Sequence, residues 1–417
     1  MTAGTLLSKR PRLHSEVRLS RRLLRGPAEI HLVKDLLSGR AFELAPREHF
    51  LVARLDGRRS LAEIGDEYAR EFGRRLAEAH WQQLLGLLYA RGLLDPGTAD
   101  QSTADPGIDP SSAAAGRTPA GSGSVAPSDR ASVPLIEWSY RRIRWALARP
   151  VVLSLLGLTV ATQVVLLANL DRAVAGLGWF WEHPLWLIAL GLLTWTSAAL
   201  HELAHGVAAR HFGCAVTAIS VVTLRCRVDG YPYLRSPGAQ ITIAGAGGLA
   251  NGVLMVPFAL TWLVLAPTAP ARPALAGIVL VGSAQSLVNL IPLPPLDGYK
   301  IVSHALGVTH LATGTRQFLW LAVRGLVGRG TGIGAYPSTA RLRYAAYGLI
   351  ALILAVTAGT ATVLLGRAVA ADRLGATAVV VTFAVVAMTV TGWLARPRRA
   401  PRAPDATERA TPQKGRD

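Results

Sequence analysis

Six stretches of this chain are long and almost free of charged residues, and they restrict its fold more than any other feature. They cover about residues 151–170, 184–200, 240–265, 274–291, 344–366 and 374–395. A helix needs about twenty residues to cross the roughly 30 Å of hydrocarbon in a bilayer. The stretches therefore predict a polytopic α-helical membrane protein with about six transmembrane helices, whose first partner is the lipid bilayer. A charged fraction of only 17% agrees with this class.

Clusters of arginine predict the orientation of these helices. One cluster precedes the first stretch, one lies between the fourth and fifth, and one follows the sixth, so six spans place all three on the same side. The positive-inside rule makes that side the cytoplasm, and both termini are then cytoplasmic. The clusters lack the interleaved aromatic residues of a nucleic-acid surface, so no nucleic acid is expected as a partner. Their members are Arg141, Arg142, Arg144 and Arg149; Arg316, Arg324, Arg329, Arg341 and Arg343; and Arg396, Arg398, Arg399 and Arg402.

The predicted location is the plasma membrane, and the richness in arginine and alanine is typical of a high-GC bacterium. Residues 1–25 are basic and lack the apolar core of a secretory signal peptide. The linker at 98–134 and the basic tail at 397–417 are predicted to be disordered, because they contain little that can be buried. The membrane part divides into a core at 135–302, a cytoplasmic loop at 303–343 and two C-terminal transmembrane helices at 344–396. Within the core, the polar and β-branched segment 215–236 predicts a short strand hairpin.

A small α+β domain of the winged-helix type is predicted on the cytoplasmic side, at residues 26–97. Alternating residues at 29–34 and 41–44, around turn-forming residues at 35–39, predict a hairpin. Ser60 and Glu63 have the spacing at which each side chain caps a free backbone donor of the other at a helix start. A last helix is predicted over about 77–91, ending at Gly92.

The second apolar stretch runs into the motif His201-Glu202-Leu203-Ala204-His205. Residues four positions apart share one face of a helix, so both imidazoles can reach one metal ion while Glu202 lies beside its open position. Charged groups in a membrane helix cost about 2.5–3.5 kcal/mol each near the bilayer centre, and such residues are usually functional. The alternative is a helix that simply ends in water with polar residues at its tip.

A catalytic zinc normally needs a third protein ligand, with water in the fourth position. Asp297 is the only acidic residue between Asp229 and Asp372, and it follows the prolines that end the fourth stretch. By itself an Asp-Gly pair after prolines is usually a turn. With six spans, however, Asp297 lies on the same side of the membrane as His201, which makes it the candidate ligand.

These motifs resemble those of the site-2 protease family of intramembrane zinc metalloproteases. The family's first motif matches at His201-Glu202-x-x-His205 and its second at Asn289-x-x-Pro292-x-x-x-Leu296-Asp297-Gly298. The resemblance implies one zinc ion held by His201, His205 and Asp297, with Glu202 as general base and Asn289 orienting the substrate or the developing oxyanion. It covers about residues 184–302. A weaker similarity at 244–251 has Gly248 where the family often has proline, and it supports close helix packing only.

The sequences "LDGRRSLAEI" and "LLYARGLLD" resemble the peptide-recognition domain of the pyrroloquinoline quinone chaperone type. That resemblance implies that residues 26–97 capture the leader of a ribosomally made peptide, which would add a strand to the hairpin edge. Winged helices also bind DNA or mediate dimers, so these alternatives remain open. The linker would allow such a domain to deliver a substrate to the membrane core.

The expected function is zinc-dependent hydrolysis of a peptide or membrane-protein substrate, with removal of a leader peptide as the first hypothesis. One alternative is signalling proteolysis of a membrane-anchored regulator of the anti-sigma-factor type. Another is a membrane protein that binds metal without catalysis. Cys214 and Cys226 are interpreted as packing residues, with pairing or an accessory metal role as the alternative. His211 and His304 are interpreted as surface or packing residues.

Overall fold

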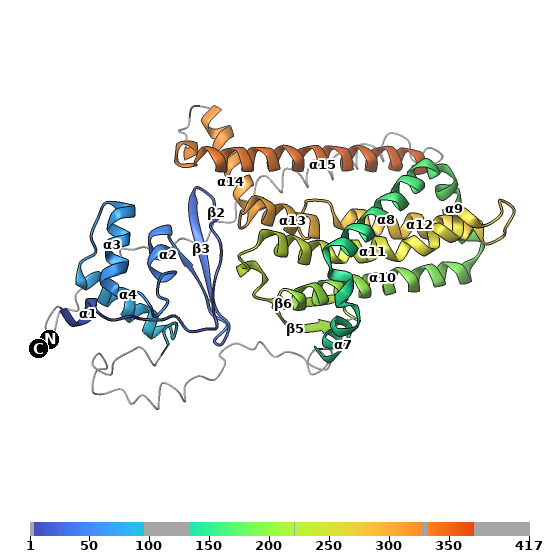
Figure 1. Ribbon diagram of the computed structural model, residues 1–417. Coiled ribbons are helices and arrows are strands. Elements are labelled where there is room, and N and C mark those ends of the chain that lie inside the picture. Colours follow the sequence, from blue (N-terminus) through green and yellow to red (C-terminus); the bar gives the residue numbers. More distant parts are fainter. Residues whose placement is uncertain (1–3, 96–132, 221, 327, 329–331, 371–417) are drawn as a thin grey trace, which may run out of the picture. The chain divides into compact units, whose positions relative to one another are not determined.

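The computed structural model describes residues 4–95, 133–220, 222–326, 328 and 332–370 (Figure 1). The predicted sixth span at 374–395, the tail at 397–417 and nearly all of the linker at 98–134 lie outside the described residues. Two compact units are distinguished. The first comprises Met1–Leu23 with Glu29–Gly307, and the second Leu24–Ala28 with Val308–Asp417.

A small antiparallel sheet near the N-terminus is organised around its longest strand, β3 (Ala28–Asp35). This strand pairs with β4 (Ala41–Leu44) and with β1 (Val17–Leu19), and β2 (Leu23–Arg25) completes the sheet. The β3–β4 pair confirms the predicted hairpin. Strands β1 and β2 come from the basic segment, along with the short helix α1 (Gly4–Leu7), and sequence analysis assigned no element there. Strands of three residues are too short to show alternation.

Three helices follow this sheet: α2 (Pro46–Val52), α3 (Leu61–Phe72) and α4 (Glu78–Ala90). The predicted cap of α3 is confirmed, because Ser60 Oγ accepts from the Glu63 amide at 3.2 Å and Glu63 Oε2 accepts from the Ser60 amide at 2.7 Å. The predicted helix end at Gly92 is also confirmed, where φ is +67°. The sequence therefore specifies the helix boundaries of this region by local hydrogen bonding.

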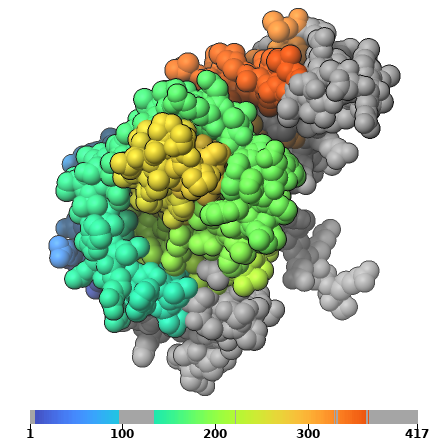
Figure 2. Space-filling model, turned by 90° about the vertical axis from the view of Figure 1, so that its right-hand side faces the viewer, coloured from blue at the N-terminus to red at the C-terminus, as the bar shows by residue number. Residues whose placement is uncertain are grey.

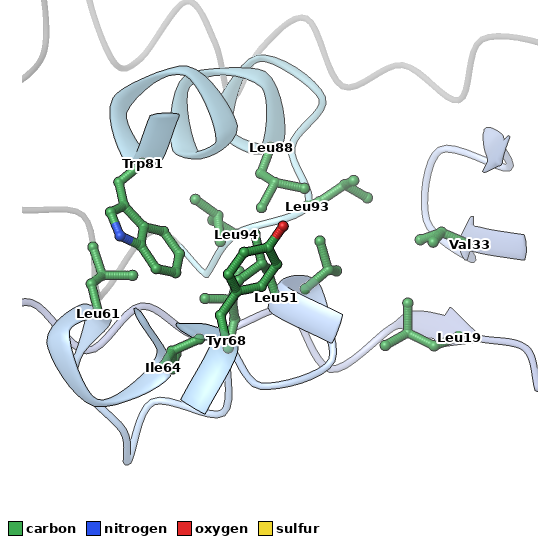
Figure 3. Packing of buried hydrophobic residues seen from close by; sticks show 12 residues of the cluster. Leu19, Val33, Leu51, Leu61, Ile64, Tyr68, Trp81, Leu88, Leu93 and Leu94 are labelled. Carbon is green, nitrogen blue, oxygen red and sulfur yellow. The ribbon is translucent and has the colours of Figure 1, made fainter. Parts of the chain in front are cut away.

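The helices enclose a hydrophobic core (Figure 3). Trp81 of α4 packs towards Leu61 and Ile64 of α3, and these three side chains are at most 1% exposed. Complete burial stabilises a folded state by about 1.5–3 kcal/mol for each large apolar side chain. Leu19 of β1 and Val33 of β3 belong to the same cluster, so sheet and helices share one core.

The chain from residue 133 onwards is mostly helical and begins with α7 (Val133–Ile143), α8 (Arg149–Ala168) and α9 (Leu170–Glu182). Next come α10 (Pro184–His211), α11 (Pro237–Val264), α12 (Arg272–Asn289) and α13 (Asp297–Leu306). Among the described residues, four helices are long and apolar enough to cross a membrane: α8, α10, α11 and the Ser338–Ala361 part of α15. Helix α12, the predicted fourth span, is not among them, because polar residues stand at its start and near its end.

Helix α11 contacts α8, α10, α12 and α13. Glycines allow these helices to approach closely, as predicted for the small residues of α11. A Cβ atom on Gly252 would lie 2.3 Å from Thr159 Cγ2 of α8, and one on Gly277 of α12 would lie 2.7 Å from Phe180 of α9. Figure 2 shows the yellow segment around the start of α12 packed between the green segments of this helix group.

Between α10 and α11 the chain forms the predicted hairpin, with β5 (Ala215–Ser220) antiparallel to β6 (Arg225–Asp229). Both strands contact α10. A Cβ atom on Gly206 of α10 would lie 3.4 Å from Cys226 Sγ of β6. The hairpin therefore lies beside the helix that carries the histidine motif.

The second unit contains α14 (Leu311–Leu326) and α15 (Ser338–Ala370). Much of the segment 303–343, predicted as a loop, is thus helical. Helix α14 buries Leu311, Thr315 and Phe318, which share one face at helical spacing. A ring of Tyr344 from α15 packs on α14 at Gly314, where a Cβ atom would lie 2.8 Å away. Arg316 and Arg324 lie within α14, and an amphipathic helix accommodates both these arginines and the buried apolar face.

Candidate metal centre

Helix α10 brings its two histidines to one face, as the four-residue spacing predicts. Their Nε2 atoms lie 3.1 Å apart, and the residues are only 6% and 8% exposed. Two neutral imidazoles whose unprotonated nitrogens face each other this closely can bind the same divalent metal ion.

Asp297 completes the group from a distant part of the chain. Its Oδ2 atom lies 2.9 Å from His201 Nε2 and 3.0 Å from His205 Nε2. The ligand atoms of these three residues all lie within 4.8 Å of one another, so the group could hold a metal ion. Asp297 is the first residue of α13, so the Asp-Gly pair begins a helix here instead of forming a turn after one.

Gly298 makes this close approach possible. A Cβ atom at this position would lie 2.0 Å from the carbonyl oxygen of Leu290, the residue that caps α12. That distance is far inside van der Waals contact, so only glycine allows the first turn of α13 to lie against the end of α12. The glycine of the motif therefore fixes where the aspartate side chain lies.

The donor set and its spacing fit a zinc ion. Two imidazole nitrogens and one carboxylate oxygen are typical zinc ligands, and catalytic sites leave the fourth position open. Bonds of about 2.0–2.1 Å in a tetrahedron separate ligand atoms by roughly 3.3 Å. The three separations here, 2.9, 3.0 and 3.1 Å, are close to that value.

Lys300 holds the second oxygen of Asp297. Its Nζ atom donates to Asp297 Oδ1 at 2.7 Å, one helical turn along α13. Burial by itself raises the pKa of Asp297, but hydrogen bonds from His201 and His205 outweigh it, and the pKa lies below its usual range. Asp297 is therefore a carboxylate, with one oxygen facing the histidines and the other facing an ammonium group.

The remaining ring nitrogens of the two histidines also have partners. His205 Nδ1 lies 2.7 Å from the carbonyl oxygen of Ile243, and His201 Nδ1 lies 3.2 Å from Nδ2 of Asn251. A Cβ atom on Gly247 would lie 2.5 Å from the His201 ring, so α11 packs directly on this ligand. Sequence analysis interpreted residues 244–251 as packing only and missed Asn251. An amide within the apolar stretch 243–260 of α11 was the available signal.

Glu202 follows His201 on α10 and Asn289 is the last residue of α12, and neither belongs to the group. Within the described part of the chain, neither is hydrogen-bonded to the three ligands. The amide of Asn289 donates to the Gln285 carbonyl of its own helix at 3.2 Å. Glu202 is half-buried on α10. Burial raises the pKa of Cys226 to about 12, and the charge of Glu202 contributes to that increase, which places the carboxylate near β6.

Two cysteines and two other histidines lie outside the group. Cys214 and Cys226 are free thiols, and burial raises the pKa of Cys214 to about 11. Both remain protonated at neutral pH, which agrees with packing residues. His211 is exposed at the end of α10, and His304 Nε2 lies 3.2 Å from the Tyr231 hydroxyl.

Comparison of the chain with protein-family models, with curated proteins and with solved structures gives no match. The assignment of a function therefore depends on the residues themselves and on their geometry.

Proposed function

We propose that this protein is a membrane-embedded zinc metalloprotease of the site-2 protease type. The observation that carries the proposal is the convergence of His201, His205 and Asp297 from segments almost a hundred residues apart. The general-base candidate, Glu202, lies on the same helix as the two histidines. The motifs that resemble the family are the ones that supply these four residues.

The chemistry follows from the roles of these side chains. His201, His205 and Asp297 would hold a zinc ion, which when bound would supply a water of lowered pKa and Lewis-acid activation of the scissile carbonyl. Lys300 keeps the carboxylate of Asp297 in place from its far side. Glu202 accepts the proton of the attacking water and returns it to the departing amine. Asn289, at the end of α12, orients the substrate once its amide turns from its helix.

The β5–β6 hairpin supplies a place for the substrate backbone. A peptide bond inside a helix is already hydrogen-bonded, so the substrate must become extended before it is cut. The two-stranded sheet has edges available for pairing with an extended chain. Because β6 packs against α10 at Gly206, next to His205, a paired substrate would lie alongside the metal centre.

The first substrate class that we propose is the leader-bearing precursor of a ribosomally made peptide. The region of residues 26–97 resembles a leader-capturing domain, and its sheet includes the short strand β4 beside β3. A leader that adds to such an edge would be held by backbone hydrogen bonds, with the side chains selecting the sequence.

Replacing Glu202 by glutamine tests the catalytic part of this proposal. We expect hydrolysis of a quenched fluorescent peptide library by the nanodisc-embedded protein to fall by about 10²–10⁴-fold, since glutamine cannot accept the proton. Zinc content should remain one ion per chain, because the three ligands are unchanged. The matched control is Glu182→Gln, at the exposed end of α9, which should keep full activity. If zinc binds but neither the wild type nor the variant hydrolyses any peptide, the protein is a metal binder without catalysis.

Deleting residues 1–96 tests the substrate class. A leader-capture enzyme should lose cleavage of a short precursor peptide encoded beside its gene, while its zinc content stays the same. Cleavage is measured by mass spectrometry of the peptide with and without its leader. Undiminished cleavage after the deletion would contradict leader capture and favour proteolysis of a membrane-anchored regulator.

A further inference from the structure

The two zinc-ligand histidines are supported in chemically different ways. A neutral imidazole carries its proton on one ring nitrogen and accepts or binds metal through the other. Both Nε2 atoms face Asp297, so metal binding requires the proton on Nδ1 of each ring. That proton needs an acceptor, because polar groups of buried side chains are nearly always hydrogen-bonded. The partner of each Nδ1 therefore decides how readily that ring binds metal.

For His205 the partner leaves no choice. The carbonyl oxygen of Ile243, 2.7 Å away, can only accept, and this fixes the proton of His205 on Nδ1. For His201 the partner is the side-chain amide of Asn251, which carries a donor, Nδ2, and an acceptor, Oδ1, on the same carbon atom. Nδ2 faces His201 Nδ1 at 3.2 Å. Rotating the amide by half a turn presents Oδ1 instead, which accepts the Nδ1 proton.

Ser197 makes both amide orientations possible. In the structure the Ser197 hydroxyl donates to Asn251 Oδ1 at 3.1 Å. After rotation of the amide, Ser197 Oγ would accept from Asn251 Nδ2, since a hydroxyl both donates and accepts. Asn251 and Ser197 are each only 1% exposed, so these contacts are sealed from solvent. Ser197 also lies on α10, one turn before His201, so the serine and the ligand share one rigid helix.

We propose that Asn251, held by Ser197, is a positioning residue that sets the proton position of His201 and thereby its affinity for metal. The inference rests on the proposed metal centre but not on proteolysis. The structural alternative is that the amide only joins α10 to α11, as polar residues do between membrane helices.

A matched pair elsewhere in the core separates the two interpretations. Gln163 of α8 donates to Ser283 of α12 at 3.2 Å, and Ser283 is 0% exposed, but among the described residues neither is hydrogen-bonded to His201, His205 or Asp297.

The test measures metal affinity, by competition of the detergent-solubilised full chain with a chromophoric zinc chelator. We expect Asn251→Leu to weaken zinc binding by about 10–100-fold, as loss of a partner of a ligand histidine usually does. Ser197→Ala should weaken it less, because the amide stays but loses its anchor. Asn251→Asp should keep the affinity or increase it, since a carboxylate accepts the Nδ1 proton without rotating. Gln163→Leu and Ser283→Ala should bind zinc as the wild type does.

A second measurement reports on the ligand itself. The visible absorption of the protein loaded with Co²⁺ in place of zinc should shift in Asn251→Leu and return to the wild-type form in Asn251→Asp. Equal zinc affinity and an unchanged cobalt spectrum in Asn251→Leu would overturn the inference. Equal weakening by Asn251→Leu, Asn251→Asp and Gln163→Leu would also overturn it, since only packing would then matter. If the wild type itself binds no zinc, the proposed function fails first.

Discussion

Replacement of Asp297 by alanine will leave the purified protein without stoichiometric zinc and without hydrolytic activity. Two histidines alone hold zinc weakly, and each ligand contributes roughly a third of the 10–16 kcal/mol typical of a complete protein site, so we expect affinity to fall by about 10³-fold or more. The change also removes the partner of Lys300 and leaves its ammonium close to the site, where it repels a cation. Zinc content by elemental analysis and affinity by chelator competition measure both effects.

A matched control separates metal binding from helix capping. Asp171 stands in the first turn of α9, as Asp297 does in the first turn of α13, but it is exposed and far from the histidines in the sequence. Asp171→Ala removes the same favourable charge at a helix start, worth about 0.3–1 kcal/mol, and should keep full zinc content. Stoichiometric zinc in Asp297→Ala at wild-type affinity would refute the proposed ligand set.

The second large effect is expected from Gly298→Ala. The added methyl group would meet the Leu290 carbonyl oxygen at 2.0 Å, and a backbone atom of a helix end cannot swing aside as a side chain can. We expect either separation of α13 from α12 or strain of about 3 kcal/mol, at the upper end of the usual cost of overpacking. Either result moves Asp297 from the histidines. Thermal unfolding in nanodiscs and zinc affinity should therefore decline together.

Gly238→Ala is the control for this substitution. Gly238 is the second residue of α11, as Gly298 is of α13, but its Cβ atom would meet only Ser236 Oγ at an ordinary 3.7 Å. Alanine is the better helix former, so this variant should be unchanged or slightly more stable. Wild-type stability and zinc affinity in Gly298→Ala would show that the end of α12 can yield, and the glycine would not set the site.

Local patterns predicted the parts of the fold that depend on neighbouring residues. The spacing of His201 and His205 predicts their shared face, and Ser60 with Glu63 predicts the start of α3. The β3–β4 hairpin follows from alternation and turn residues, and the β5–β6 hairpin from a polar segment rich in β-branched residues. The cap residues lie three positions apart and the two histidines four, and each hairpin joins strands that are consecutive in the chain, so the sequence order carries the geometry.

Other features depend on contacts that the sequence order does not carry. Asn251 is fifty residues from His201, and only the packing of α11 on α10 brings them together. The role of Gly298 depends on where α12 ends, so the Asp-Gly pair predicted a metal ligand at Asp297 but no packing role for the glycine. Helix α14 was missed because its arginines were interpreted as part of a cytoplasmic loop, and the three residues of β1 are too few to show alternation.

The centre described here connects residues 96 positions apart, as the His201–Asp297 contact shows. In lipid, apolar helices gain little from meeting one another, because acyl chains are as apolar as leucine. An ion bound by both segments would act as a cross-link that closes this large loop, and its binding energy would count towards holding α10 and α13 together. Loss of the ion would then loosen the architecture as well as abolish the proposed hydrolysis.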